Sequence, residues 1–170
     1  YLFAKKLKKN IKYYSSIDKI LKEEKPDIVS ICTWKDSHFS IAKKCINFGI
    51  KNIVLEKPLA TSIAEGKKLI NLTKKHKVKI IVNHRRRFDK EIIGLRNKIN
   101  KNIIGKIKKV SCNYVYGIQA TGTHVVDTLR MLFKDTAGEI SHVIGIYSDK
   151  RDFCAKDDQN IDFIIYFKKG

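Results

Sequence analysis

The sequence predicts an α/β protein in which a partial parallel sheet is followed by a truncated α+β domain with an open sheet. Two observations predict this class. Strand-length apolar runs alternate with helical segments up to residue 88, and longer strands around few helices follow. A length of 170 residues allows one domain or two partial ones. We place the boundary near residues 88–104, so that 1–88 form the first domain and 89–170 the second.

Three short runs in the first part have the length and β-branched composition of buried strands. They are Asp27–Thr33, Asn52–Leu55 and Val78–Val82. Strands separated by helices of 10–15 residues indicate a parallel sheet with right-handed crossovers.

Helices are expected before and between these strands, because each intervening segment begins with a capping residue. The predicted helices run from Ser16 to about Glu24, from Asp36 or Ser37 to about Phe48, and from the capping box of Ser62 and Glu65 to about His76. In the second of them, Ile41, Ala42, Cys45 and Ile46 share one apolar face, and Gly49 is a fitting residue after its end.

The second part is predicted to hold two helices and three longer strands. The helices are Asp89–Asn100 and Thr121–Phe133, and the strands are Lys106–Val115, Glu139–Tyr147 and Asn160–Phe167. The charged, irregular segment Tyr147–Ile161 is a candidate substrate loop with no assigned ligand. Because the first residue is Tyr1 rather than Met and the chain ends at Gly170 with no partner supplied for the last strand, we expect both domains to continue beyond this sequence.

The net charge of +19 allows two interpretations. A clustered basic face would bind nucleic acid or an anionic membrane. However, 30 of the 36 basic residues are Lys, they are spread along the chain, and Lys, Ile and Asn share AT-rich codons. We therefore interpret the charge as a solvated surface and expect neither a nucleic-acid nor a membrane partner.

The four cysteines form no C-x-x-C pair, so zinc-ribbon and thioredoxin chemistry lack support and no metal is expected. Cys32 and Cys112 lie in apolar runs and are predicted to be small core residues. Free thiols and the lack of a targeting signal in Tyr1–Asn10 favour a cytoplasmic location. The apolar runs are too short to span a bilayer.

Polar side chains follow each strand of the first part, and the carboxyl ends of parallel strands meet at one edge of a sheet, where ligands bind. Because three polar clusters fall at this one edge, the sequence predicts a ligand-binding site there. The three clusters are Thr33, Trp34, Ser37 and His38; then Glu56, Lys57 and Pro58; then Asn83, His84, Arg85, Arg86 and Arg87.

Lys57 lies between Glu56 and Pro58. A Lys that precedes Pro is held in an extended conformation, so the direction of its backbone is restricted. A Lys in such a position can donate to a substrate oxygen or accept a proton. The alternative is a surface Glu-Lys pair that precedes a helix. The indole of Trp34 can lie against a cofactor ring or fill a groove between domains.

His124, Asp127 and Arg130 share one helix face. A His that opens a helix can donate or relay a proton, but it can equally form only a local hydrogen bond. The run from Arg85 to Arg87 can bind the phosphate of a cofactor or of a nucleotide-sugar, or it can be a solvated loop in which one Arg pairs with Glu56.

In order and spacing, these landmarks resemble the Gfo/Idh/MocA oxidoreductases from about Tyr14 to Gly170. No single motif is specific, but the ordered set is. The landmarks are the strand Asp27–Thr33, His38, Glu56-Lys57-Pro58, Arg86-Arg87-Phe88-Asp89, Ile104-Gly105-Lys106-Ile107, Gly122-Thr123-His124 and Asp127. The stretch Tyr116–Phe133 resembles members from polysaccharide and sugar-modification pathways.

The resemblance implies a Rossmann domain followed by a substrate domain that often forms homo-oligomers. It implies hydride transfer between NAD or NADP and a hydroxyl carbon of a sugar, polyol or nucleotide-sugar. The roles implied for single residues are catalysis by Lys57 and His124, cofactor contact by Thr33, Trp34, His38, Glu56 and Lys57, and substrate contact by Arg86 and Asp127.

Three departures from the family pattern matter. The G-x-G-x-x-G turn is absent and is expected before Tyr1, so the fragment alone is expected to bind a dinucleotide poorly and to be inactive. Ala120 stands where many members have Asp, and Trp34 where many have Pro. Ala120 favours the alternative of an inactive binding or regulatory protein on the same fold, and the basic charge leaves a nucleic-acid binder as the other alternative.

Overall fold

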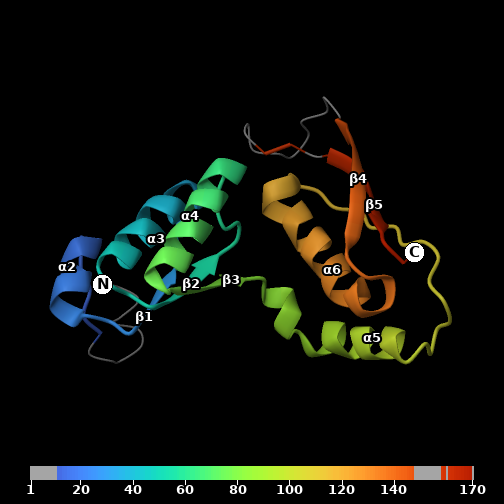
Figure 1. Ribbon diagram of the computed structural model, residues 1–170, viewed down its shortest axis with the longest axis horizontal. Helices are drawn as coiled ribbons and strands as arrows, with labels where there is room; N and C mark the ends of the chain where they lie inside the picture. The colour runs from blue at the N-terminus through green and yellow to red at the C-terminus, as the bar shows by residue number, and fades with distance from the viewer. Residues whose placement is uncertain (1–10, 148–157, 160, 170) are drawn as a thin grey trace. The chain divides into compact units, whose positions relative to one another are not determined.

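A computed structural model of the chain describes residues 11–147, 158–159 and 161–169. The chain divides into two compact units, Tyr1–Val82 and Asn83–Gly170 (Figure 1). A three-stranded sheet of order β1-β2-β3 and a separate two-stranded sheet, β4-β5, confirm the predicted fold class. The segment Tyr147–Ile161, considered above as a substrate loop, falls mostly outside the described residues.

The sheet of the first unit is parallel, as predicted. Its strands are β1 (Ile28–Ile31), β2 (Asn52–Glu56) and β3 (Lys79–Asn83). Strands β1 and β2 run in the same direction, with Ile28 opposite Asn52 and Ile31 opposite Leu55. Their carboxyl ends therefore meet at one edge of the sheet.

The helices of the first unit are α2 (Ile17–Glu24), α3 (His38–Asn47) and α4 (Ile63–His76). Helices α3 and α4 lie side by side (Figure 1). Sequential strand order with right-handed crossovers places both on the same face of the sheet.

The core of the first unit lies between this pair of helices and the sheet. The apolar face predicted for the second helix is confirmed, because the face of α3 that carries Ala42, Cys45 and Ile46 is buried against β1 and β2. Leu55 of β2 and Leu69 of α4 are both 0% exposed.

The caps follow the predictions in part. The Ser62 hydroxyl accepts from the Glu65 backbone N–H at 3.2 Å, so the predicted N-terminus of α4 is confirmed. The predicted side-chain cap on α3 is wrong. A 3-10 turn, η1 (Lys35–Ser37), leads into this helix, and Ser37 has helical φ and ψ of −95° and −8°. Its hydroxyl donates to the Trp34 carbonyl at 2.8 Å instead of capping the helix.

The second unit combines two helices and a hairpin-like sheet. After the 3-10 turn η2 (Arg85–Phe88) come α5 (Lys90–Asn100), the π-helical turn η3 (Ile118–Gly122) and α6 (Thr123–Ala137). Strands β4 (Ile140–Tyr147) and β5 (Ile161–Phe167) pair in antiparallel register, with an irregularity between Ile140 and His142.

A small core holds α5, α6 and the end of β5 together. Ile99 of α5 packs with Leu132 and Phe133 of α6. The ring of Phe133 meets that of Phe167 edge to face, with the centroids 6.2 Å apart. Asp89 caps α5, because its carboxylate accepts from the Glu91 backbone N–H at 2.8 Å.

The strand predicted at Lys106–Val115 is wrong, since this segment contains no regular secondary structure. Its alternation of apolar and polar residues has the period of a strand, but strand formation requires a pairing partner and a face to bury. Strands β4 and β5 pair with each other. In the segment itself, Ile107 and Tyr114 alone are partly buried.

The predicted burial of two cysteines is also wrong. Cys32 and Cys112 are exposed, because β1 ends at Ile31 and Cys112 lies in the segment without a strand. Cys45 is the buried thiol on α3, and burial raises its pKa. Among the described residues, no helix has the length and apolar character needed to cross a bilayer.

Replacing Leu69 by Ala tests the core of the first unit. Leu69 is fully buried, so the substitution removes apolar contacts and leaves a cavity. We expect the free energy of unfolding, measured in urea, to fall by about 2–5 kcal/mol. Ile63 on the same helix is 79% exposed, and Ile63→Ala is the matched control with little expected loss. Equal losses in the two variants would contradict this packing.

Candidate functional site

One group of candidate residues lies at the carboxyl ends of β1 and β2 in the first unit. Thr33 and Trp34 follow β1, and Trp34 presents an indole that is 85% exposed. Glu56 ends β2, and Lys57 follows it, with both residues half-buried. The peptide bond between Lys57 and Pro58 is cis.

His38 joins the two loops that carry these residues. Its Nδ1 lies 2.7 Å from the Pro58 carbonyl oxygen, and its Nε2 lies 3.0 Å from the Thr33 carbonyl oxygen. The residue is 1% exposed and is the first residue of α3. The loop after β1 is further tied to the start of α3 by a 2.7 Å hydrogen bond between the Thr33 and Ser37 hydroxyls.

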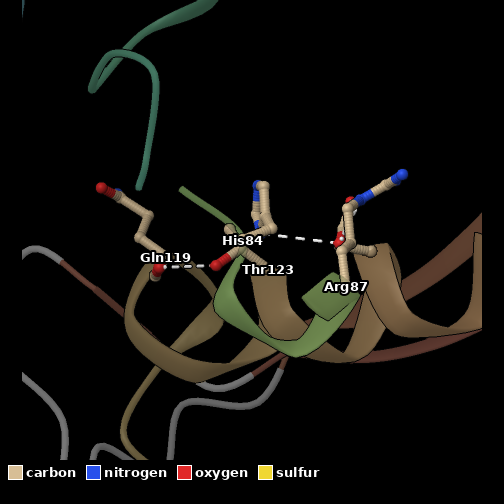
Figure 2. A network of polar contacts seen from close by, with 5 residues as sticks. His84, Arg87, Gln119 and Thr123 are labelled. Atoms are coloured by element: carbon tan, nitrogen blue, oxygen red, sulfur yellow. Dashed lines mark hydrogen bonds and ion pairs between the residues drawn. The ribbon is translucent and has the colours of Figure 1, made fainter. Parts of the chain in front are cut away.

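A second group lies in the second unit, where η2 meets the first turns of α6 (Figure 2). Arg87 binds Asp127 in a bidentate manner, with Nε 2.8 Å from Oδ2 and Nη2 2.7 Å from Oδ1. The Asp127 side chain is only 13% exposed. The hydrogen bond from Arg87 to Asp127 raises the pKa of the Arg87 guanidinium, so the guanidinium remains charged.

His84 and His124 adjoin this ion pair. Their rings meet edge to face, with the centroids 6.0 Å apart. The Nδ1 of His84 lies 3.8 Å from Oδ2 of Asp127, close enough for an ion pair when the ring is protonated. Two imidazoles therefore lie beside a carboxylate of fixed orientation, and imidazole and carboxylate groups are the side chains most often used for general acid–base catalysis.

The turn that precedes His124 is held by a carboxylate from a distant part of the chain. Asp158 is 3% exposed and accepts from the backbone N–H groups of Gln119 and Ala120, each at 2.7 Å. Gly117 has φ +89°, and a Cβ there would lie 2.4 Å from Cγ of Asp158. Thr123, the first residue of α6, donates to the Gln119 carbonyl at 3.0 Å (Figure 2).

The structure brings some predicted residues together and leaves others apart. His124 and Asp127 share the start of α6, and the carboxylate of Asp127 is held by Arg87. Arg86 is exposed on η2, so its predicted contact with substrate stays a prediction. The cofactor contacts predicted for Thr33, Trp34, Glu56 and Lys57 likewise stay predictions, whereas both ring nitrogens of His38, also predicted to contact the cofactor, face protein carbonyls.

Sequence reasoning missed Asp158 as a member of this site, and it placed His84 and Arg87 in a candidate polar cluster without predicting their contacts with Asp127. The position of His84 and Arg87 after a strand was a usable signal, because they lie in the polar cluster that follows β3. For Asp158 there was no signal, since 38 residues separate it from the backbone N–H of Ala120 that it binds.

Comparison with known proteins shows which protein family the first half of this chain resembles. Residues 3–84 match the family described as the oxidoreductase family with an NAD-binding Rossmann fold, GFO_IDH_MocA. This match covers just under half of the chain and confirms the predicted resemblance to the Gfo/Idh/MocA oxidoreductases. The uncharacterized oxidoreductase YhhX of Escherichia coli is 35% identical over 80 residues, which are 47% of this chain and 23% of that protein.

Solved structures show the same fold over most of the chain. An oxidoreductase structure from Klebsiella pneumoniae has a TM-score of 0.79 at 21% identity and covers 99% of this chain and 49% of that one. An inositol dehydrogenase homolog from Azotobacter vinelandii, complexed with NADH and myo-inositol, has a TM-score of 0.67 at 18% identity and covers 82% of this chain and 41% of that one. The chain therefore spans about half the length of these structures.

Replacing Asp158 by Ala tests the cap on the turn before His124. Two partly buried N–H groups lose their acceptor, and an unsatisfied buried donor costs about 1–3 kcal/mol. We expect a fall of that order in the free energy of unfolding, and a smaller fall for Asp158→Asn, which keeps one acceptor oxygen. Asp162→Ala removes an exposed carboxylate and is the control. A loss for Asp158→Ala no larger than that of the control would contradict the cap.

Proposed function

We propose that the whole protein is an NAD- or NADP-dependent dehydrogenase that acts on a hydroxyl carbon of a sugar, polyol or nucleotide-sugar. The observation that carries the proposal is the position of Lys57, which follows β2 at the carboxyl end of a parallel sheet in an NAD-binding oxidoreductase family. The structural neighbour complexed with NADH and myo-inositol supports a polyol among the substrate classes.

The donors at the edge of the first unit fit a nicotinamide dinucleotide. The exposed indole of Trp34 offers an aromatic face, the Thr33 hydroxyl can bind a ribose hydroxyl or a phosphate oxygen, and Lys57 supplies a cation. Thr33, Trp34, Glu56 and Lys57 would hold the cofactor. When bound, it supplies the hydride acceptor or donor, and the protein supplies binding and orientation.

In this mechanism Lys57 and His124 handle the oxygen and the proton. The Lys57 ammonium donates a hydrogen bond to the reacting oxygen, which favours the carbonyl form of the product and positions the carbon that loses the hydride. His124 takes the hydroxyl proton during oxidation and returns it during reduction. Arg87 holds Asp127, one turn from His124 along α6, so that the orientation of the Asp127 carboxylate is fixed.

Replacing Lys57 by Met in the whole protein tests the proposal. The substitution keeps the length of the side chain but removes the donor, so we expect kcat to fall by on the order of 10²–10⁴. Turnover is followed by NAD(P)H absorbance over a panel of sugars, polyols and nucleotide-sugars. Lys68→Met, at an exposed position on α4, is the control and should retain activity.

Full activity of Lys57→Met would remove Lys57 from the mechanism. Binding of NAD(H) by the unsubstituted protein without turnover of any panel member would identify a binding or regulatory protein instead.

We also propose that the whole protein forms a homo-oligomer through the outward face of the β4–β5 sheet. On that face Ile144 lies opposite Ile164, and the rings of His142 and Tyr166 stack with their centroids 4.3 Å apart. Ile144 and Ile164 are 47% and 50% exposed. A second copy of the same apolar face is the partner that this composition fits.

Ile144→Lys combined with Ile164→Lys tests this face. Two charges on the apolar surface oppose its burial, so we expect a smaller particle mass by light scattering after size-exclusion chromatography. The control is Ile63→Lys, at an exposed position of the first unit. An unchanged mass for the double variant would contradict the proposal.

A further inference from the structure

We propose that His38 is a positioning residue for Lys57, because it locks the loops after β1 and β2 to each other. The inference rests on the proposed function of Lys57 and adds a residue that acts through the backbone. The observation behind it is that a buried imidazole has a carbonyl oxygen against each ring nitrogen, one from each loop.

The burial of His38 favours a role behind the site rather than contact with a ligand. The residue is 1% exposed, and both of its ring nitrogens are already occupied by protein carbonyls. It begins α3, which Ala42 and Cys45 anchor in the core at 0% exposure. The imidazole is therefore fixed to a rigid element, and the two loops are fixed to the imidazole.

The contact with the second loop acts one residue away from the proposed catalytic group. The carbonyl that accepts from Nδ1 belongs to Pro58, the residue that follows Lys57. Displacement of a reacting group by about 1 Å can cost on the order of 10²-fold in rate. Loss of this hydrogen bond is therefore expected to lower kcat, although His38 contacts no reacting atom.

The contacts of the His38 ring with Pro58 and with Thr33 can be tested one at a time by substitution. A neutral imidazole carries one N–H and can donate to one carbonyl, whereas the doubly protonated ring donates to both. An Asn side chain places its amide nitrogen near the position of Nδ1, and a Gln side chain places it near the position of Nε2. His38→Asn thus keeps the bond to Pro58, and His38→Gln keeps the bond to Thr33.

The experiment compares His38→Asn, His38→Gln and His38→Ala in the whole protein, with the sugar and polyol panel and NAD(P)H absorbance. We expect kcat to fall by about 10–100-fold in His38→Gln and His38→Ala, with rescue to within about 5-fold of the unsubstituted protein in His38→Asn. The substrate KM should change little, because the displaced group acts on the reacting oxygen. Cys45→Ala changes a buried residue of the same helix that belongs to neither loop, so it should lower stability and leave kcat unchanged.

Equal kcat values for the Asn and Gln variants would overturn the inference. So would a loss of kcat in Cys45→Ala as large as that in His38→Gln, because the effect would then follow the stability of the fold.

A second readout separates this inference from the proposed function. Hydrogen exchange of the backbone amides in residues 57–62 should be faster in the Gln and Ala variants than in the Asn variant, whether or not the protein turns over any substrate. Equal exchange in the three variants would overturn the inference by itself. Absence of turnover in the unsubstituted protein, with exchange as expected, would overturn only the proposed function.

Discussion

The carboxyl edge of the parallel sheet depends on the contacts of the two His38 ring nitrogens with the Thr33 and Pro58 carbonyl oxygens. Parallel strands deliver their following loops to the same edge, but pairing alone does not fix the loops once the strands end. A side chain that reaches both loops from the start of a helix supplies the missing constraint. The loops that carry the exposed indole of Trp34 and the half-buried Lys57 then share one anchor.

In the second unit, charged side chains fix the backbone and side chains around the candidate site. The carboxylate of Asp158 holds the turn before α6 by accepting from two of its backbone N–H groups. Asp158 lies so close to the chain that only Gly fits at position 117. On the same helix, Arg87 holds the carboxylate of Asp127 beside His84 and His124. The carboxylate of Asp127 and the turn before His124 thus each have a contact that fixes their position.

The alternation of strands and helices could be predicted from the sequence because it is a local pattern. The β-branched runs gave β1, β2 and β3, and Ser62 gave the start of α4. The prediction was wrong where the outcome depended on a distant partner. Lys106–Val115 has strand-like composition but pairs with no strand in the part of the chain that the structure describes, and Cys32 lies just beyond the end of β1.

The site could be predicted in part for the same reason. The order of Thr33, His38 and Lys57 along the chain indicated which residues gather at the sheet edge. It could not show that the ring of His38 faces two carbonyls, because that contact joins residues 20 positions apart in sequence. Nor could it show that Asp158 reaches the backbone of Ala120, where the family pattern has an acidic side chain.

The central claim is that the loops after β1 and β2 form the cofactor edge of an oxidoreductase, and hydrogen exchange of the whole protein with and without NADH tests it most directly. We expect NADH to slow exchange in residues 33–38 and 56–62, with no change on the solvent face of α4 as the internal control. Protection confined to other segments, or no protection at saturating NADH, would contradict the claim.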